Sequence, residues 1–260
     1  MKMHLRQSGD RSQPAILFLH AIGTSGWMWE DQFPRLRGFR CIAPDLPGHG
    51  ASRSIRWRSL EDTADRIANL IRSEVPTGRA HVVGLSLGAY VGLTLLSRHQ
   101  DVVERAVLSG LNICPLPHKR LMTVMSYAMA PLLKTSLGAR MNAKALAIPA
   151  DHFAGYRQSL RELSLAGFLA ASRDASGFAM PGNSRQIATP TLLIAGEREH
   201  PLILRSMGIL ADALPHAQTR LAQGLSHGWC GEAPELFAAT VDAWCKGGAL
   251  PDVLLLPDRR

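Results

Sequence analysis

Gly-Leu-Ser-Leu-Gly, at residues 84–88, is the stretch from which the fold can be predicted. It follows a short apolar run at residues 81–83 and leads into a helix-compatible stretch at residues 89–99. A serine at the tip of a tight turn between a strand and a helix is held in a strained backbone conformation, which needs small neighbours on either side. The two glycines supply them. The pattern therefore predicts a strand, a sharp turn and a helix, with Ser86 as a candidate nucleophile.

The rest of the sequence has to support this pattern, which is weak by itself in a chain with 23 glycines. Short apolar runs of strand character alternate with longer helical patterns along the chain. The runs lie at residues 15–19, 41–43, 81–83, 105–108, 191–195 and 219–222. This alternation predicts an α/β fold with a mostly parallel central sheet and helices on both faces.

One predicted helix spans residues 59–75. Ser59 followed by Asp62 is typical of a helix N-terminus. Apolar residues recur at helical spacing behind this start and should face the sheet: Leu60, Ala64, Ile67, Ile71 and Val75. We therefore assign this helix to the core and give it no chemistry.

The alternation breaks between residues 112 and 181, which show helical rather than strand character. We interpret residues 112–181 as a helical cap inserted into a core formed by residues 1–111 and 182–260. Three methionines lie in an uncharged part of the cap: Met122, Met125 and Met129. They could line a pocket for an irregular apolar ligand or simply fill the core of the cap.

The composition fits one α/β domain with an insertion, since the chain has 260 residues of which 46% are hydrophobic. Its net charge of +8 comes from 24 arginines and five lysines. We find no dense basic cluster with interleaved aromatic residues, the pattern that follows a nucleic-acid backbone. We expect a diffusely basic surface and no nucleic-acid partner.

Targeting signals and cysteine spacing bear on the compartment. The cysteines, which lack the spacing of a metal site or a disulfide framework, are Cys41, Cys114, Cys230 and Cys245. Residues 1–11 lack an apolar signal core, and the longest uncharged run, residues 81–97, is shorter than a membrane span. We expect a cytoplasmic protein with no membrane partner. The apolar run at residues 253–256 should pack on the body or on a second copy, so a homodimer stays open.

An activated serine needs a base to take its proton and a third group to orient that base. His227 lies in a glycine-flanked loop after the last strand-like run, and a neutral imidazole suits proton transfer near neutral pH. Two carboxylates, Glu197 and Glu199, follow the preceding run. We favour Glu199 as the orienting acid and keep Glu197 as the alternative. The order serine, acid, histidine is then the one expected of this architecture.

The oxyanion that develops on an attacked carbonyl needs hydrogen-bond donors. The backbone N–H of Leu87, at the start of the helix after the turn, is one candidate. The other should come from the loop after the first strand-like run, and we choose the N–H of Ile22. Backbone donors impose no side-chain type, so both assignments depend on placement alone.

Three segments together resemble the α/β-hydrolase fold family. Residues 17–23 (Leu-Phe-Leu-His-Ala-Ile-Gly) resemble its oxyanion loop, residues 45–52 (Asp-Leu-Pro-Gly-His-Gly-Ala-Ser) its segment after the next strand, and residues 84–88 its nucleophile turn. The resemblance covers most of the chain outside the cap. It implies eight mostly parallel strands, a helical cap after the sixth family strand, and no metal or organic cofactor. Since only residues 2–6 precede the first clear run, the first family strand could be missing.

This chain departs from the family pattern at two positions. Ala21 stands where the family usually has glycine, which could alter the path of the loop but leaves the N–H of Ile22 in place. Glu199 stands where the family places an aspartate. The longer side chain can orient a histidine if its backbone lies further back, or it could mark a displaced triad.

The resemblance and the candidate residues favour a serine hydrolase that cleaves a carboxylic ester or lactone through an acyl-enzyme, with a small-molecule substrate. A serine at the turn argues against dehalogenase and epoxide-hydrolase chemistry. The alternatives are C–C bond hydrolysis or perhydrolysis on the same triad. A non-catalytic ligand-binding protein is a further alternative, supported only by Glu199 in place of aspartate.

Overall fold

The computed structural model describes residues 1–117, 124–125, 127–128, 130–145 and 148–257. Within these residues one sheet has eight strands in the order β1-β3-β2-β4-β5-β6-β7-β8. The strands are β1 (Leu5–Ser8), β2 (Ala15–Leu19), β3 (Arg40–Pro44), β4 (Ala80–Leu85), β5 (Val103–Ser109), β6 (Thr191–Gly196), β7 (Ala217–Ala222) and β8 (Leu254–Leu255). The pairs from β3 through β7 are parallel, and only the outer strands β1 and β8 pair antiparallel with their neighbours. The mostly parallel sheet predicted from the sequence is confirmed.

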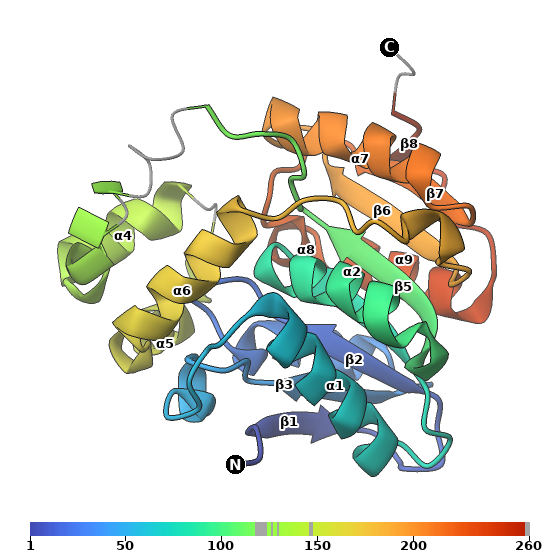
Figure 1. The fold of residues 1–260 in the computed structure, drawn as a ribbon, viewed down its shortest axis with the longest axis horizontal. Helices are drawn as coiled ribbons and strands as arrows, with labels where there is room; N and C mark the ends of the chain where they lie inside the picture. The colour runs from blue at the N-terminus through green and yellow to red at the C-terminus, as the bar shows by residue number, and fades with distance from the viewer. Residues whose placement is uncertain (118–123, 126, 129, 146–147, 258–260) are drawn as a thin grey trace.

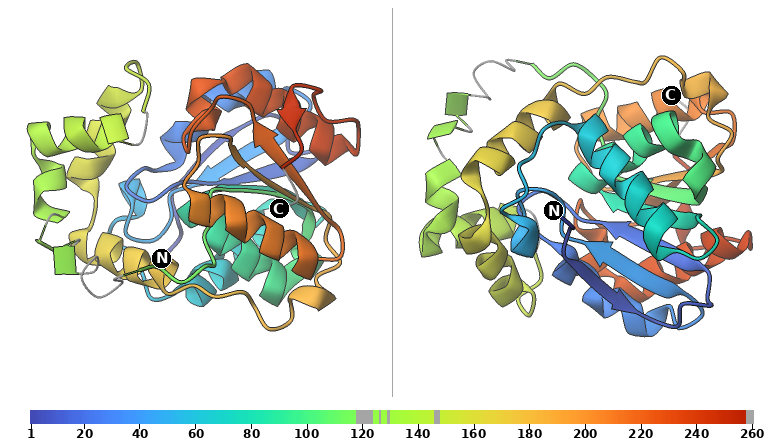
Figure 2. Two further views of the ribbon diagram at one scale, coloured as in Figure 1. Left: turned by 90° about the horizontal axis from the view of Figure 1, so that it is seen from above. Right: turned by 60° about the horizontal axis from the view of Figure 1, so that its bottom comes forward.

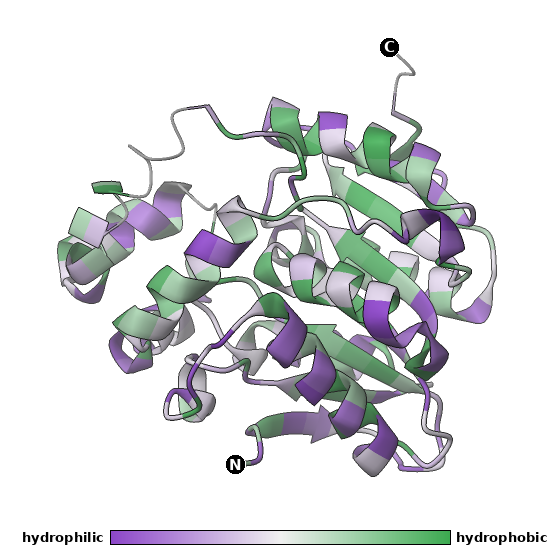
Figure 3. Ribbon diagram, viewed as in Figure 1, coloured by the Kyte–Doolittle hydropathy of each residue, from purple (hydrophilic) through white to green (hydrophobic). Residues whose placement is uncertain are grey.

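Helices cover both faces of this sheet (Figure 1). One face carries α1 (Leu60–Glu74), α2 (Leu87–His99) and α7 (Pro201–Ala213), and the other carries the 3-10 helix η1 (Gly26–Arg35), α8 (Trp229–Glu232) and α9 (Pro234–Lys246). Side chains alternate between the two faces along each strand, so Leu17 and Val82 pack under α1 and α2, whereas Phe18 and Val83 pack under η1 and α9. Figure 3 shows apolar strands in the middle of the molecule and polar residues on the surrounding helices.

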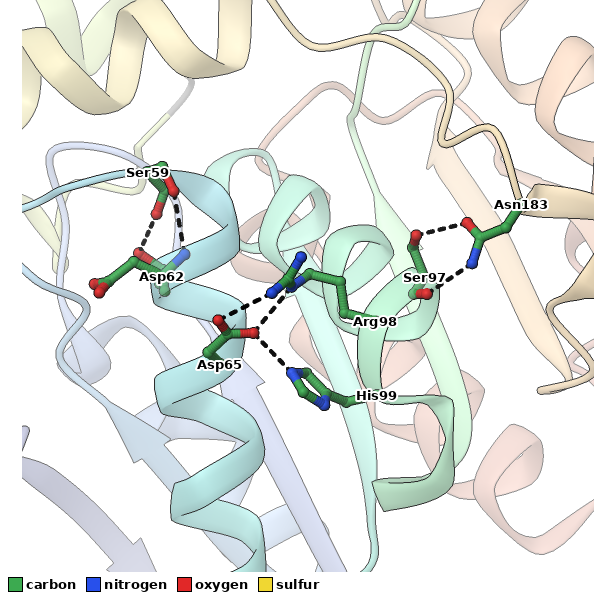
Figure 4. A network of polar contacts seen from close by, with 8 residues as sticks. Ser59, Asp62, Asp65, Ser97, Arg98, His99 and Asn183 are labelled. Carbon is green, nitrogen blue, oxygen red and sulfur yellow. Dashed lines mark hydrogen bonds and ion pairs between the residues drawn. The ribbon is translucent and has the colours of Figure 1, made fainter.

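The α1 helix begins as predicted, because the Ser59 hydroxyl accepts a hydrogen bond from the backbone N–H of Asp62 at 3.1 Å. The apolar residues at helical spacing are all buried. Polar contacts tie α1 to α2 at the surface (Figure 4): Asp65 accepts hydrogen bonds from Arg98, with Nε 2.9 Å away, and from His99, with Nε2 2.7 Å away. These partly exposed ion pairs contribute little to stability, and the apolar contacts beneath them hold the two helices together.

The cap lies beyond one end of the sheet (Figures 1 and 2). Between β5 and β6 the described chain forms η4 (Ala130–Lys134), α4 (Ser136–Ala145), α5 (Phe153–Glu162), α6 (Leu165–Ser176) and the short η5 (Ser184–Gln186). Helices α4 and α5 share a small apolar core of their own with the residue that follows α5; it is formed by Ala139, Ala143, Tyr156, Leu160 and Leu163. Of the three cap methionines, Met122 and Met129 lie outside the described residues, and the side chain of Met125 is exposed.

The two ends of the chain add strands that the sequence pattern did not predict. β1 pairs with β3, from Leu5 opposite Pro44 onward. In the tail, Leu254 is buried and pairs with Ala222, whereas Val253 and Leu256 are exposed, so only the middle of the apolar run packs on the body of the same chain. A strand of two residues shows no alternation that a sequence pattern could reveal. Among the described helices, none combines the length and the apolar character needed to cross a membrane.

Candidate active site

Ser86 lies between β4 and α2, with φ 53° and ψ −114°. Among the described residues it is the one non-glycine residue with a positive φ, a conformation that costs about 1–3 kcal/mol and persists only where the surroundings enforce it. A Cβ atom on Gly84 would lie 2.4 Å from the carbonyl oxygen of Gly88, and one on Gly88 would lie 2.0 Å from that of Leu19. The strained turn expected from the sequence is therefore present, and both glycines are required by close backbone contacts.

Hydrogen bonds fix this turn on both sides. The N–H of Ser86 donates to the carbonyl oxygen of Ser109, the last residue of β5, over 2.8 Å, and the carbonyl of Ser86 accepts from Ala89. Leu87 is the first residue of α2, so its N–H has no acceptor within the helix and is available to a bound anion.

His227 follows β7, and its Nδ1 lies 2.6 Å from Oε2 of Glu199. A carboxylate can only accept, so Nδ1 carries the proton and Nε2 keeps a lone pair with which to act as a base. The Glu199 side chain is buried, and its Oε1 accepts a hydrogen bond from the N–H of His200 at 2.9 Å. Burial acts to raise the pKa of Glu199, but the hydrogen bonds and the charges of His227 and His200 outweigh it and hold this pKa below its usual value.

Glu197, the alternative acid, has a different partner. Its Oε2 accepts a hydrogen bond from the N–H of Gly224 at 2.7 Å, which orders the turn after β7. Glu197 is itself exposed to solvent. Of the two carboxylates, the structure brings Glu199 and not Glu197 to the imidazole.

Gly110 is a feature of the site that the sequence pattern did not reveal. It follows β5 with φ 71°, and a Cβ atom there would lie 2.6 Å from Cε1 and 3.0 Å from Nδ1 of His227. The imidazole therefore lies directly against this backbone. The sequence does show a glycine directly after a predicted strand, but it does not show which side chain packs against that glycine.

Ser86 and His227 line one cavity of about 70 Å³. Ile22 also lines this cavity. No hydrogen bond joins Ser86 to His227 in the described structure, and hydrogen bonds of this kind often tighten only when a substrate binds. The other lining residues are Ala21, Thr24, Trp27, Met28, Leu85, Ile148, Pro149, His152, Gly228, Cys230 and Gly231. None of these described lining residues is an aspartate, glutamate, lysine or arginine, so the cavity is largely apolar and carries no fixed charge.

Two of the lining residues join the cap to the core. Trp27, from η1, donates a hydrogen bond through Nε1 to the hydroxyl of Ser159 in α5. His152, just before α5, holds Asp31 of η1 through Nε2, and its ring stands edge-on to Trp27 with the centroids 5.9 Å apart. The cap thus closes one side of the cavity through contacts between residues far apart in the sequence.

The loop that carries Ile22 is fixed by a fully buried histidine. His20 donates from Nδ1 to the carbonyl of Ala21 at 2.8 Å and accepts from the N–H of Leu46 at Nε2 over 2.9 Å. Burial lowers the pKa of His20 to about 4, so the ring is neutral and can make both bonds. Gly23 has a φ of 76°, which favours glycine, whereas the φ of Ala21 is not positive.

Comparisons with known proteins agree with this architecture. A family model described as "Alpha/beta hydrolase family" matches residues 16–240. An AB hydrolase superfamily protein of Gibberella zeae is 29% identical over 254 residues, covering 92% of this chain and 82% of the relative. A pimeloyl-[acyl-carrier protein] methyl ester esterase of Neisseria meningitidis is 34% identical over 110 residues, 40% of this chain and 41% of that protein.

Among solved structures, the enol-lactonase of Burkholderia xenovorans superposes with a TM-score of 0.79 at 23% identity, covering 94% of this chain and 96% of that one. That likeness establishes the fold. The family model covers strands β3 to β7 and all but the first residue of β2, together with the serine turn and the histidine loop, in one match. On this match and the parallel sheet that carries the turn, the chain belongs to the alpha/beta hydrolase family.

Proposed function

We propose that this protein is a serine hydrolase that cleaves a carboxylic ester or lactone, with Ser86 as nucleophile, His227 as base and Glu199 as orienting acid. The observation that carries the proposal is the 2.6 Å hydrogen bond that Nδ1 of His227 donates to Glu199, because the same imidazole shares a cavity with the strained Ser86. The names of the Neisseria esterase and the Burkholderia lactonase point to the same class of acyl chemistry.

The reaction follows from the protonation states. The Nε2 lone pair of His227 takes the proton of the Ser86 hydroxyl as its oxygen attacks the carbonyl carbon of the substrate. The Glu199 carboxylate stabilises the imidazolium that forms, and the N–H groups of Leu87 and Ile22 donate to the oxyanion. His227 then protonates the leaving alcohol, giving an acyl-enzyme. A water molecule, deprotonated by the same imidazole, attacks the acyl carbon and releases the acid and Ser86.

The cavity limits the group that can enter it. A single water needs roughly 10–15 Å³ of such space, so about 70 Å³ holds roughly five non-hydrogen atoms. Its walls are mainly apolar, and among the described lining residues no charged side chain could pair with a substrate carboxylate. We therefore propose a short, uncharged acyl group.

The test is hydrolysis of p-nitrophenyl esters with acyl chains from acetyl to octanoyl, together with a small lactone panel, by the wild type and by Ser86→Ala. We expect turnover that depends on Ser86 and falls as the acyl chain exceeds about five atoms. Covalent labelling by a fluorophosphonate reports an activated serine independently of the substrate. Labelling without cleavage of any ester or lactone would favour C–C bond hydrolysis on the same residues, and absence of both would favour a ligand-binding protein.

A further inference from the structure

A groove of about 770 Å³ lies along α6, apart from the reaction cavity. One wall is the segment of residues 53–58, and the other is the α6 face that carries Ala166, Leu169 and Ala170. The groove and the reaction cavity share no lining residue. Its size falls within the usual range of small-molecule sites, about 300–1,000 Å³.

Every ionisable side chain that the structure places in the wall of this groove, apart from Tyr127, is an arginine: Arg53, Arg56, Arg58 and Arg173. Three of them come from a six-residue segment in which Ile55 and Trp57 point inward and are buried. The fourth comes from α6, more than a hundred residues further along the chain.

These arginines are poorly paired within the protein. Arg58 and Arg173 each have a carboxylate only at 3.8 Å, on Asp62 and Asp174. Both carboxylates have closer partners, since Asp62 binds Arg66 at 2.7 Å and Asp174 accepts from Trp57 at 2.9 Å. Among the described residues, Arg53 and Arg56 have no carboxylate within ion-pair distance. All four side chains are exposed, so their guanidinium groups are accessible to an anion from solvent.

The walls are also held in place. The Nε1 of Trp57 donates to Asp174, which fixes the arginine segment to α6. Nearby, the N–H of Ser164 donates to the carbonyl of Gly48 at 3.1 Å. Little backbone ordering would accompany ligand binding, which favours affinity. By contrast Arg98, in the neighbouring surface contacts between α1 and α2, is already paired with Asp65 (Figure 4).

We propose that this groove binds an organic diphosphate, with its phosphates on the arginines and its apolar part on α6. Guanidinium groups form two parallel hydrogen bonds to phosphate oxygens, and four of them exceed the demand of a single carboxylate. The concave shape suits a small molecule rather than a flat membrane or protein surface. Because Trp57 is buried, it offers no face on which a nucleic-acid base could stack.

The test is calorimetric titration with adenosine, AMP and ADP at constant ionic strength. We expect affinity to rise with the number of phosphates, with ADP at least about tenfold tighter than AMP. The double variant R53Q/R56Q should weaken ADP binding at least about tenfold. The control R35Q/R37Q removes the same charge from the end of η1 and the turn after it, on the opposite face of the sheet, and should bind ADP as the wild type does.

Several results would overturn the proposal. If both double variants weaken ADP binding equally, the effect comes from net charge alone. If adenosine binds as tightly as ADP, the groove does not recognise phosphate. Binding of phosphatidylglycerol vesicles that depends on Arg53 and Arg56, without binding of ADP, would assign the arginines to a membrane surface. Since the measurement is binding, it is independent of whether the protein cleaves esters.

Discussion

Replacing Gly110 by alanine should impair catalysis through the position of His227 alone. The added Cβ would lie 2.6 Å from Cε1 of His227, whereas ordinary contact begins at 3.4 Å, so the ring must move by about 0.8 Å. The hydrogen bond between Nδ1 and Glu199 limits that movement to a swing away from β5. A misplacement of about 1 Å in a catalytic group can cost about 100-fold in rate, and we expect a loss of this order in kcat/KM.

Gly78→Ala is the matched control. Gly78 has φ 68°, close to the 71° of Gly110, but a Cβ atom there would meet nothing within 4 Å. Both variants should lose about 1–2 kcal/mol of unfolding free energy, because an L-residue is strained at positive φ. Only the Gly110 variant should lose activity, since only there does the new atom reach the imidazole.

The assay combines ester hydrolysis, the rate of fluorophosphonate labelling at Ser86, and urea unfolding of both variants. Labelling of Gly110→Ala should slow in proportion to hydrolysis, because both reactions need the base. If Gly110→Ala is destabilised like Gly78→Ala yet keeps activity within about twofold, then either His227 does not lie against β5 or it does not act as the base.

Three further outcomes follow from the same geometry. Glu199→Gln should lower kcat by about 100-fold to 10,000-fold and Glu199→Asp should also lower it, whereas Glu197→Gln should stay near wild type in steady-state kinetics. Burial lowers the pKa of His81 to about 4, so stability is lost as the pH falls from 6.5 toward 4, where only the unfolded chain binds this proton. Urea unfolding of His81→Gln should show a pH slope smaller by about one proton, or about 1.4 kcal/mol per pH unit. In urea unfolding, the free energy of unfolding of Ser86→Gly should be about 1 kcal/mol higher than that of Ser86→Ala, because glycine tolerates φ 53°.

The regular part of the fold could be predicted because burial imposes a pattern on the sequence. The strand at residues 191–195 is a continuous apolar run, as expected for a strand buried on both faces, and α1 repeats its apolar residues at helical spacing. β8 could not be predicted, since its pairing with β7 depends on contacts made only after the chain folds back. The interruption of the pattern indicates helices between β5 and β6, but it does not reveal their contacts with η1.

Two residues of the candidate site, Ser86 and His227, could be proposed from the sequence because each lies in a recognisable local pattern. A serine between glycines, and a histidine in a loop after the last predicted strand, can both be found in a sequence. The walls of the site could not be found in this way, because Trp27 and His152 meet only through the packing of the cap. The arginine groove could not be predicted for the same reason. Arg173 lies near residues 53–58 only in the folded chain, where Trp57 donates a hydrogen bond to Asp174 of α6.

The glutamate in place of the family's aspartate has a geometric explanation. The loop after β6 is anchored beside β7, since the N–H of Glu197 donates to the carbonyl of Ala222 at 3.0 Å and that of Arg198 to the carbonyl of Leu225 at 2.9 Å. From a backbone held there, a glutamate reaches one carbon–carbon bond, about 1.5 Å, further than an aspartate, and its Oε2 arrives 2.6 Å from Nδ1 of His227. An aspartate at the same position would leave the imidazole without its acceptor unless the loop moved. The longer side chain therefore suits the position of this loop, so the departure from aspartate does not by itself favour the ligand-binding alternative.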